Sequence, residues 1–236
     1  MEILAIECSG TSGSVALSKD SKSSIIALRP DTGSLQELAQ AIEQLNPERP
    51  DFICVTAGPG SFTGIRVGLT TAKMLALAWQ RPVVPVNTLE VVAHRSLQGF
   101  DCINEPSQVP TLIMPVINAY RGQVFTAAWK VVDEIGLGEC VFTPQVCDAK
   151  LWQSGDLIPK GDWGSRIAVS GPGLRTYPMS AGHTITPANA FWDPRAEDVL
   201  EVGIKQWKVS GGETAANVQA NYLRASAAEE KLKSTT

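Results

Sequence analysis

Apolar positions in the first half of the chain predict a β-hairpin followed by buried strands. Residues 2–8 form a short apolar run. After a turn rich in serine and glycine, residues 14–19 alternate between apolar and polar side chains, which is typical of a hairpin. Residues 23–28 are compatible with a third strand. The apolar runs at 51–57 and 82–86 predict strands with both faces buried, so this half is expected to contain a sheet.

Helical periodicity marks three segments between these strands. The first begins after Ser34, a residue type that can cap a helix. Its apolar face consists of Leu35, Leu38, Ala39, Ile42 and Leu45. A long helix is predicted from the glycine-rich turn at residues 58–64 to Trp79, and Thr88 can cap a third helix over residues 89–97.

The second half opens with a pattern similar to that of the first. Residues 99–110 contain glycine, asparagine, two prolines and charges, so they predict a linker. An apolar run at 111–117, a turn and a strand at 123–131 then echo the hairpin at the start of the chain. We therefore expect an N-terminal lobe over residues 1–101 and a C-terminal lobe over residues 102–236, with the last residues able to return to the first lobe.

Residues beyond this point show a weaker pattern. Residues 151–160 fit no single element, whereas residues 167–170 predict a strand that enters a tight turn. Residues 195–207 predict a helix, and residues 220–224 are expected to end the fold.

Composition narrows the class of protein. The chain has 236 residues, of which 44% are hydrophobic, so it can bury one large core or two smaller ones. It carries 24 acidic and 20 basic residues, and the net charge of −4 argues against a protein that grips nucleic acid by itself. No apolar run approaches the length of a membrane span, and the N-terminus lacks a basic signal-peptide region, so a cytoplasmic protein without membrane contact is expected.

Cysteine and histidine are too few, or too scattered, for common metal or disulfide motifs. The five cysteines are odd in number and have no C-x-x-C spacing, which favours reduced cysteines that pack in the interior. The two histidines, His94 and His183, lie far apart, which excludes a metal site of the H-E-x-x-H type. His94 lies among apolar helical positions and is expected to be structural.

The glycine-rich turn at residues 58–64 has two interpretations. Such a turn at the start of a helix can hold a phosphate on free backbone N–H groups. It lacks the Gly-Lys-Ser/Thr of a P-loop, and short glycine turns also occur where chains pack closely.

Small residues recur every fourth position along the following helix. They are Gly64, Gly68, Ala72 and Ala76. A stripe of this kind lets another backbone approach closely. The backbone can belong to the chain's own sheet or to a partner protein, with Arg66, Thr70, Thr71 and Lys73 available beside it.

Polar residues at the ends of two apolar strands suggest a degenerate nucleotide cleft. Two facing strand–turn–strand units could hold phosphates, and acids at the strand ends would bind Mg²⁺. The two positions carry Glu7 and Asn118, and a neutral amide weakens binding of a hard cation. The candidate cleft residues are Glu7, Ser9, Thr11, Asn118 and Arg121.

Four segments resemble the TsaB (YeaZ) family. They are ILAIECSGTSGSVAL at residues 3–17, GPGSFTGIRVGLTTAKMLALAWQRPVVPVNTLEVVA at residues 58–93, INAYRGQVFTAAW at residues 117–129 and NYLR at residues 221–224. The second segment is the most specific. Residues 135–215 carry little resemblance.

The resemblance implies an α/β fold of the actin/heat-shock-chaperone ATPase type, with two ribonuclease-H-like lobes of mixed sheets flanked by helices. It implies a non-catalytic subunit that stabilises the related catalytic subunit TsaD. Together with the ATPase TsaE, that assembly forms threonylcarbamoyladenosine beside the tRNA anticodon. It further implies a homodimer when the chain is alone, tRNA contact only through the complex, and no cofactor except ATP or ADP at the complex interface.

The resemblance also implies that the first two long helices contact the partner. The residues expected at this interface are Leu35, Leu38, Ile42, Ser61, Phe62, Thr63, Gly64, Arg66, Val67, Gly68, Thr71, Ala72 and Leu75.

Three departures from the family pattern bear on catalysis. Aspartates of the two hairpins are replaced by Glu7 and Asn118, and a histidine often found near the first helix is missing around residues 31–35. No catalytic or metal-binding residue is therefore assigned. The alternatives are an active ATPase or small-molecule kinase of the same fold, and a metallopeptidase of the glycoprotease type.

Overall fold

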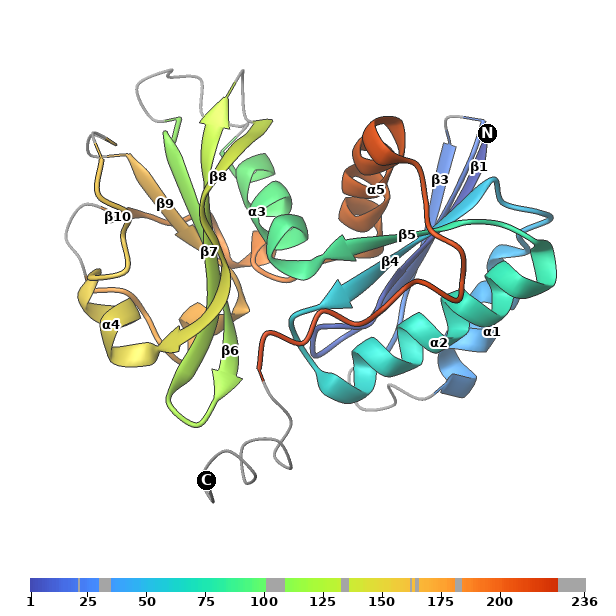
Figure 1. Cartoon of the computed structure of the whole chain (residues 1–236), viewed down its shortest axis with the longest axis horizontal. Coiled ribbons are helices and arrows are strands. Elements are labelled where there is room, and N and C mark those ends of the chain that lie inside the picture. Colours follow the sequence, from blue (N-terminus) through green and yellow to red (C-terminus); the bar gives the residue numbers. More distant parts are fainter. Residues whose placement is uncertain are drawn as a thin grey trace.

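The computed structural model shows two lobes that lie side by side (Figure 1). It describes residues 1–20, 22–29, 35–100, 109–132, 136–161, 163, 166–180 and 184–224. Ser34, His183, the lobe boundary expected at residues 101 and 102, and residues 31–34, where the family histidine is missing, lie outside these ranges.

The first lobe is built on a five-stranded mixed sheet. Its strands are β1 (Glu2–Glu7), β2 (Ser14–Lys19), β3 (Lys22–Ala27), β4 (Phe52–Gly58) and β5 (Val83–Asn87). Their order is β3-β2-β1-β4-β5. The first three strands are antiparallel neighbours, whereas β4 runs parallel to both β1 and β5. The predicted hairpin and buried strands are therefore present.

The second lobe repeats this arrangement strand for strand. Its strands are β6 (Leu112–Tyr120), β7 (Gln123–Val132), β8 (Gly136–Asp148), β9 (Ile167–Ser170) and β10 (Thr184–Ile185). The order is β8-β7-β6-β9-β10. Strands β8, β7 and β6 are antiparallel neighbours, and β9 runs parallel to both β6 and β10. The weak echo in the sequence thus reflects two sheets of one topology, and the expected two-lobed α/β fold is confirmed.

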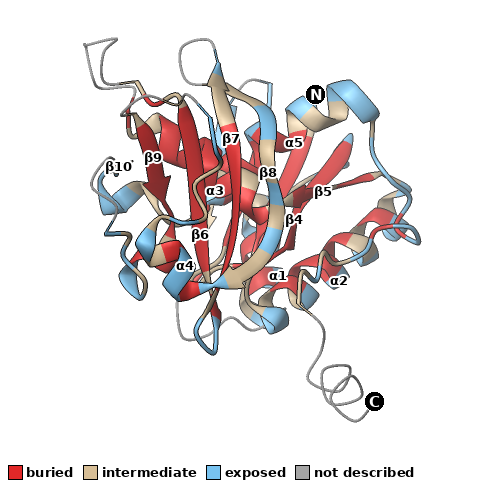
Figure 2. Ribbon diagram, turned by 60° about the vertical axis from the view of Figure 1, so that its left-hand side comes forward, coloured by how far each residue is buried: buried red, intermediate tan, exposed pale blue. Residues whose placement is uncertain are grey.

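Helices cover both faces of each sheet. They are α1 (Leu35–Leu45), α2 (Phe62–Trp79), α3 (Thr88–Gln98), α4 (Ala149–Ser154) and α5 (Ala196–Ser210), with 3₁₀ turns at Pro172–Arg175 (η2) and Asn189–Phe191 (η3). Helices α1 and α2 pack on one face of the first sheet and α5 packs on the other. Helix α3 packs on the second sheet, with α4 on its far side. Figure 2 shows the buried strands between these helix layers.

A polar seam between α3 and α5 joins the two lobes. Arg95 Nη1 lies 3.2 Å from the fully buried Asp198 carboxylate, and His94 Nε2 lies 2.7 Å from Glu201 Oε2. Burial raises the pKa of Asp198 to about 6, although the Arg95 charge opposes this shift. The hydrogen bond from His94 lowers the pKa of Glu201. His94 is thus a structural residue, as its helical setting predicted.

Local structure departs from the sequence pattern at two places. Asn87, not Thr88, caps α3, because the Asn87 side-chain oxygen accepts a hydrogen bond from Leu89 N at 2.9 Å. Strand β8 has no sequence signal because it is an edge strand with both faces partly exposed, so its residues alternate poorly. Within the described ranges, no helix has the length and hydropathy that a membrane crossing requires.

Candidate functional site

A cleft of 690 Å³ lies between the two lobes. The turn between β1 and β2 and the first turn of α2 form its first wall, and the end of β6 with η2 forms the second. Ser9, Thr11 and Asn118 line it, together with Arg175 and Thr176. The structure thus brings three of the five predicted cleft residues together.

Glu7 does not face this cleft. Its side chain is fully buried beneath the turn, where Oε1 accepts hydrogen bonds from the backbone N–H and the hydroxyl of Ser9. Its second oxygen, Oε2, has no hydrogen-bond partner. Burial raises the pKa of Glu7 to about 7, with a smaller contribution from the charge of Asp193, although the Ser9 hydrogen bonds oppose both. Glu7 is therefore a buried, easily protonated group and not an exposed metal ligand.

The matching position of the second lobe is also engaged within the protein. Asn118 Oδ1 accepts a hydrogen bond from Tyr120 N at 2.7 Å, and Nδ2 lies 3.4 Å from Thr176 Oγ1. The nearby cation, Arg175, binds both carboxylate oxygens of Asp193, at 2.7 and 2.8 Å. Arg121 does not line the cleft. The polar groups of the cleft are thus largely committed to one another.

These groups do not fit a magnesium-bound nucleotide. A hard divalent cation is best held by carboxylate oxygens that face it. Glu7 is buried and does not line the cleft, Asn118 supplies a neutral amide, and Asp193 is paired with Arg175. Among the described residues, no group of three or more His, Cys, Asp or Glu side chains is arranged to hold a metal ion.

The glycine-rich turn before α2 is a packing site for the β1–β2 turn. Ser61 caps α2 by accepting a hydrogen bond from Gly64 N at 3.2 Å, and Ser61 N donates to Ser9 O at 2.8 Å. A side chain at Gly64 would overlap the carbonyl oxygen of Cys8. Glycine is therefore needed here because the backbone of the chain's own hairpin passes against the helix.

The small-residue stripe of α2 also faces the β1–β2 turn and the first sheet, which corrects the expectation that it meets a partner. A Cβ atom at Gly68 would lie 3.3 Å from Cys8 Cβ, and Ala72 and Ala76 are buried in the core beneath α2. The predicted interface residues that the chain itself buries are Leu38, Ile42, Gly68, Thr71 and Ala72. The stripe serves close packing of helix on sheet.

Other predicted interface residues do reach the surface. The exposed ones are Leu35, Phe62, Thr63 and Arg66, and the half-buried ones are Ser61, Gly64, Val67 and Leu75. The interface expected on α1 is thus reduced to Leu35, whereas α2 keeps an accessible side.

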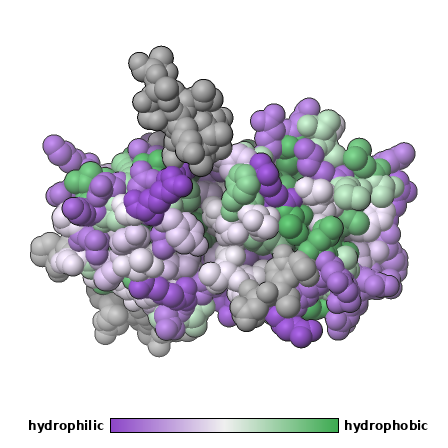
Figure 3. All heavy atoms as spheres, turned by 90° about the horizontal axis from the view of Figure 1, so that it is seen from below, coloured by the Kyte–Doolittle hydropathy of each residue, from purple (hydrophilic) through white to green (hydrophobic). Residues whose placement is uncertain are grey.

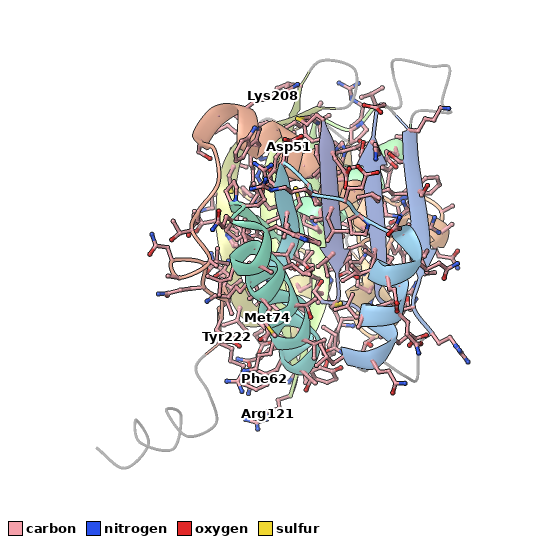
Figure 4. All side chains as sticks on the ribbon, turned by 90° about the vertical axis from the view of Figure 1, so that its right-hand side faces the viewer. Asp51, Phe62, Met74, Arg121, Lys208 and Tyr222 are labelled. Atoms are coloured by element: carbon pink, nitrogen blue, oxygen red, sulfur yellow. The ribbon has the colours of Figure 1, made fainter. Side chains whose placement is uncertain are left out.

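The exposed side of α2 carries three apolar side chains, with a cation and a threonine between the first and the second of them. We define the outer face of α2 as Phe62, Arg66, Thr70, Met74 and Leu77. Met74 is 64% exposed and Leu77 is 70% exposed. Figure 4 looks onto this side of the helix, with Phe62 and Met74 labelled. In Figure 3, which views the molecule from below, green apolar residues gather on the half that contains the first lobe.

Tyr222 joins this outer face from the far end of the chain. Its ring lies 5.4 Å from that of Phe62, and its hydroxyl accepts a hydrogen bond from Arg66 Nε at 3.2 Å. The Arg66 guanidinium lies 3.9 Å above the Phe62 ring. Sequence reasoning missed Met74, Leu77 and Tyr222. Only the NYLR segment, which resembles the family, gave a signal for Tyr222.

The two mixed sheets of one topology, flanked by helices and separated by a cleft, define a two-lobed α/β protein. The family model described as "TsaD: tRNA N6-adenosine threonylcarbamoyltransferase" matches residues 33–231. The chain belongs to this threonylcarbamoyltransferase family and, within it, to the TsaB group.

Two curated relatives carry the name "tRNA threonylcarbamoyladenosine biosynthesis protein TsaB". The protein from Escherichia coli (strain K12) is 27% identical over 246 residues, which cover 98% of each chain. The protein from Bacillus subtilis (strain 168) is 32% identical over 137 residues, which cover 55% of this chain and 56% of that one. A tRNA N6-adenosine threonylcarbamoyltransferase from Thermomicrobium roseum is 38% identical over 81 residues, which span 32% of this chain and only 22% of that protein.

Solved structures show the same fold. YeaZ from Pseudomonas aeruginosa matches with a TM-score of 0.70 and 19% identity over 94% of this chain and 99% of that one. A second structure, described as an uncharacterized protein with similarity to peptidase YEAZ from Pseudomonas aeruginosa, has a TM-score of 0.71 with 20% identity over 94% of this chain and 99% of that one. At these identities the likeness concerns the fold alone.

Proposed function

We propose that the chain is the non-catalytic subunit that binds and stabilises a TsaD-type transferase during formation of threonylcarbamoyladenosine beside the tRNA anticodon. The observation that carries this proposal is the match with the E. coli TsaB protein, which covers 98% of both chains. The transferases themselves are matched only in part, as the T. roseum protein illustrates.

The cleft supports a role without catalysis. Transfer or hydrolysis of a nucleotide needs a positioned metal ion and groups that face the reacting atoms. Glu7 is buried below the cleft, and Asn118 is bonded to Tyr120 N. For the same reason neither alternative, an active ATPase or kinase or a metallopeptidase, is favoured.

The outer face of α2 supports a role in binding. Exposed apolar residues that gather on one helix face are a common feature of protein–protein interfaces. We infer that the TsaD-type subunit covers this face together with Leu35, and that two copies of the chain cover it mutually when the partner is absent. A pairing of two identical faces would hide the same apolar surface.

The remaining assignments follow from this role. We propose that tRNA and a TsaE-type ATPase are reached only through the complex, in keeping with the net charge of −4. ATP or ADP would then be bound only at the complex interface. The setting would be the cytoplasm, where tRNA is modified.

The test is a binding and modification assay with purified components of one organism. The tagged TsaD-type subunit should retain this chain, and removing the chain should abolish or strongly reduce tRNA threonylcarbamoylation. The chain alone should show concentration-dependent dimers by sedimentation. Modification at an unchanged rate without the chain would contradict the proposal.

A further inference from the structure

The segment after α5 runs back across the first lobe and ends against the second (Figure 1). We call residues 213–224 the C-terminal strap. Glu213 exchanges two backbone hydrogen bonds with Val83, at 2.8 and 2.9 Å, and Asn221 N donates to Ala57 O at 2.7 Å. A Cβ atom at Gly58 would lie 2.7 Å from Asn221 O, so glycine lets the strap approach β4 closely. The strap is therefore an integral part of the fold.

Its last residues also contact the second lobe. Leu223 packs against the core cluster of α3 and the second sheet, and Arg224 Nη1 donates to Ala119 O of β6 at 3.0 Å. Tyr222 lies between these anchors and Asn221, and its side chain is 46% exposed. Because the neighbouring residues are fixed on both lobes, Tyr222 has a defined position at the surface.

Tyr222 restrains two side chains of the outer face of α2. Its hydroxyl accepts a hydrogen bond from Arg66 Nε, and its ring lies beside the ring of Phe62. The Arg66 guanidinium stacks above that same Phe62 ring. Free arginine and aromatic side chains on a surface sample many rotamers, and ordering them on binding reduces affinity. A group that orders them beforehand removes part of that loss.

A groove lies between the strap and α2. Its volume is 370 Å³, and the lining residues include Arg66, Thr70, Lys73, Val218, Ala220 and Tyr222. Lys73 Nζ donates to Val218 O at 2.9 Å, which fixes the ammonium at this groove. Among the described residues, no carboxylate lies within ion-pair distance of Arg66 or Lys73. The groove thus offers two cations next to the exposed apolar residues of the outer face of α2.

We propose that the C-terminal strap is the second half of the partner-binding face. The groove between the strap and α2 takes a carboxylate of the partner, and Tyr222 positions Phe62 and Arg66 for docking. This inference rests on the proposed function, and the occupant it names is an acidic side chain on a TsaD-type subunit. Cations beside exposed apolar side chains match a partner helix with apolar residues and one acid.

The test compares Tyr222→Ala and Tyr222→Phe with the wild-type chain in titrations with the TsaD-type subunit at low and high salt. Tyr222→Ala should weaken binding at least tenfold, and Tyr222→Phe, which keeps the ring but loses the Arg66 hydrogen bond, should weaken it by about threefold. Leu151→Ala is the matched control, because Leu151 is also 46% exposed but lies on α4. Thermal unfolding verifies that each variant is folded.

Several outcomes separate this inference from the proposed function. If the wild-type chain does not bind the TsaD-type subunit, the proposed function fails. If it binds and Tyr222→Ala binds within twofold of wild type, the strap has no part in recognition and only the inference is overturned. If the affinity of the wild-type chain does not depend on salt, the proposal that the groove binds a carboxylate of the partner is overturned. Non-additive losses in Tyr222→Ala, Arg66→Ala and the double variant support the positioning role.

Discussion

The two lobes share one sheet and differ in what connects its strands. In the first lobe, the connections before and after β4 contain α1 with 11 residues and α2 with 18. In the second lobe, the connections before and after β9 contain α4 with six residues and η2 with four. The sheet is thus retained in both copies, whereas, within the described residues, long helices lie in these two connections only in the first lobe. The corresponding elements of the second lobe, α4 and η2, are too short to offer a helical face like that of α2.

The hairpin turns differ in the same sense. In the first lobe, residues 8–13 connect β1 to β2 and pack against the start of α2. In the second lobe, Arg121 and Gly122 alone connect β6 to β7, and nothing lies within 4 Å of a Cβ atom built on Gly122. The first turn is part of a packed core, whereas the second is open. Substitutions at the two turns should therefore have very different effects.

The largest expected effect comes from Gly64→Ala in the first lobe. The added methyl group would overlap Cys8 O, so backbone or helix must shift, and we expect a loss of about 3 kcal/mol or more in the free energy of unfolding. Gly122→Ala is the matched variant of the second lobe. It should lose only about 1 kcal/mol, from its positive φ of 74°. Urea unfolding measures both, and equal losses would remove the contrast between the turns.

The second effect concerns Glu7 and pH. Its pKa is about 7 in the folded chain, above the ordinary 4.5, so the folded state holds this proton more tightly than the unfolded state. The stabilisation of the folded state by this tightly held proton is complete below pH 4.5 and is lost as pH rises through 7. Glu7→Gln should remove this loss, so at pH 8 the variant should be more stable than wild type by up to about 3 kcal/mol.

The matched variant for this pH effect is Asn118→Gln at the corresponding strand end of the second lobe, where no carboxylate is present. The difference in unfolding free energy between this variant and wild type should not change between pH 5 and pH 8. Thermal unfolding across that pH range measures whether the effect of the substitution depends on pH at Glu7 and not at Asn118. An unchanged pH profile for Glu7→Gln would show that Glu7 is ionised within the fold.

The third effect is on partner binding. Met74→Arg places a charge on the outer face of α2, and we expect at least a tenfold loss of affinity for the TsaD-type subunit. Because Met74 is 64% exposed, unfolding should change by no more than about 0.5 kcal/mol. Leu151→Arg, on α4 of the second lobe, should leave affinity unchanged. Equal losses from both variants would mean that binding is not confined to the first lobe.

The smallest effect is expected from Asn118→Asp, which restores an acid at the cleft. Glu7 remains buried beneath the turn in this variant, so the cleft still lacks a pair of carboxylates that face it. Calorimetry with Mg-ATP should show less than a twofold change in heat or affinity. Tight binding by the variant would show that Asn118 alone prevents nucleotide binding.

The sequence predicted elements well where a pattern was local. The hairpin, the strands β4 to β7 and the helices α1, α2 and α5 have strong periodicity, and their positions agree with the structure to within a few residues. Strand β8 lies at an edge and shows no regular alternation. The sequence pattern places the cap of α3 one residue too late, at Thr88, because asparagine at 87 and threonine at 88 are both residue types that cap helices.

The candidate site was predictable only in part. Ser9, Thr11 and Asn118 line the cleft, because the turn after β1 and the end of β6 converge in a duplicated fold. The direction of the Glu7 side chain depends on the turn that folds over it. For the helix stripe, periodicity identified a close-packing face but could not identify what packs there.

The sequence by itself indicated two lobes, a long helix with a stripe of small residues, and a glutamate and a neutral amide at the two strand ends. These properties follow from residue types and local spacing. The tertiary structure alone decided which side of α2 is open, because the hairpin backbone at Cys8 occupies the glycine side. It also brought Tyr222 to Arg66 and Phe62 across more than 150 positions of sequence. Contacts of that range depend on the path of the whole chain, which no local pattern encodes.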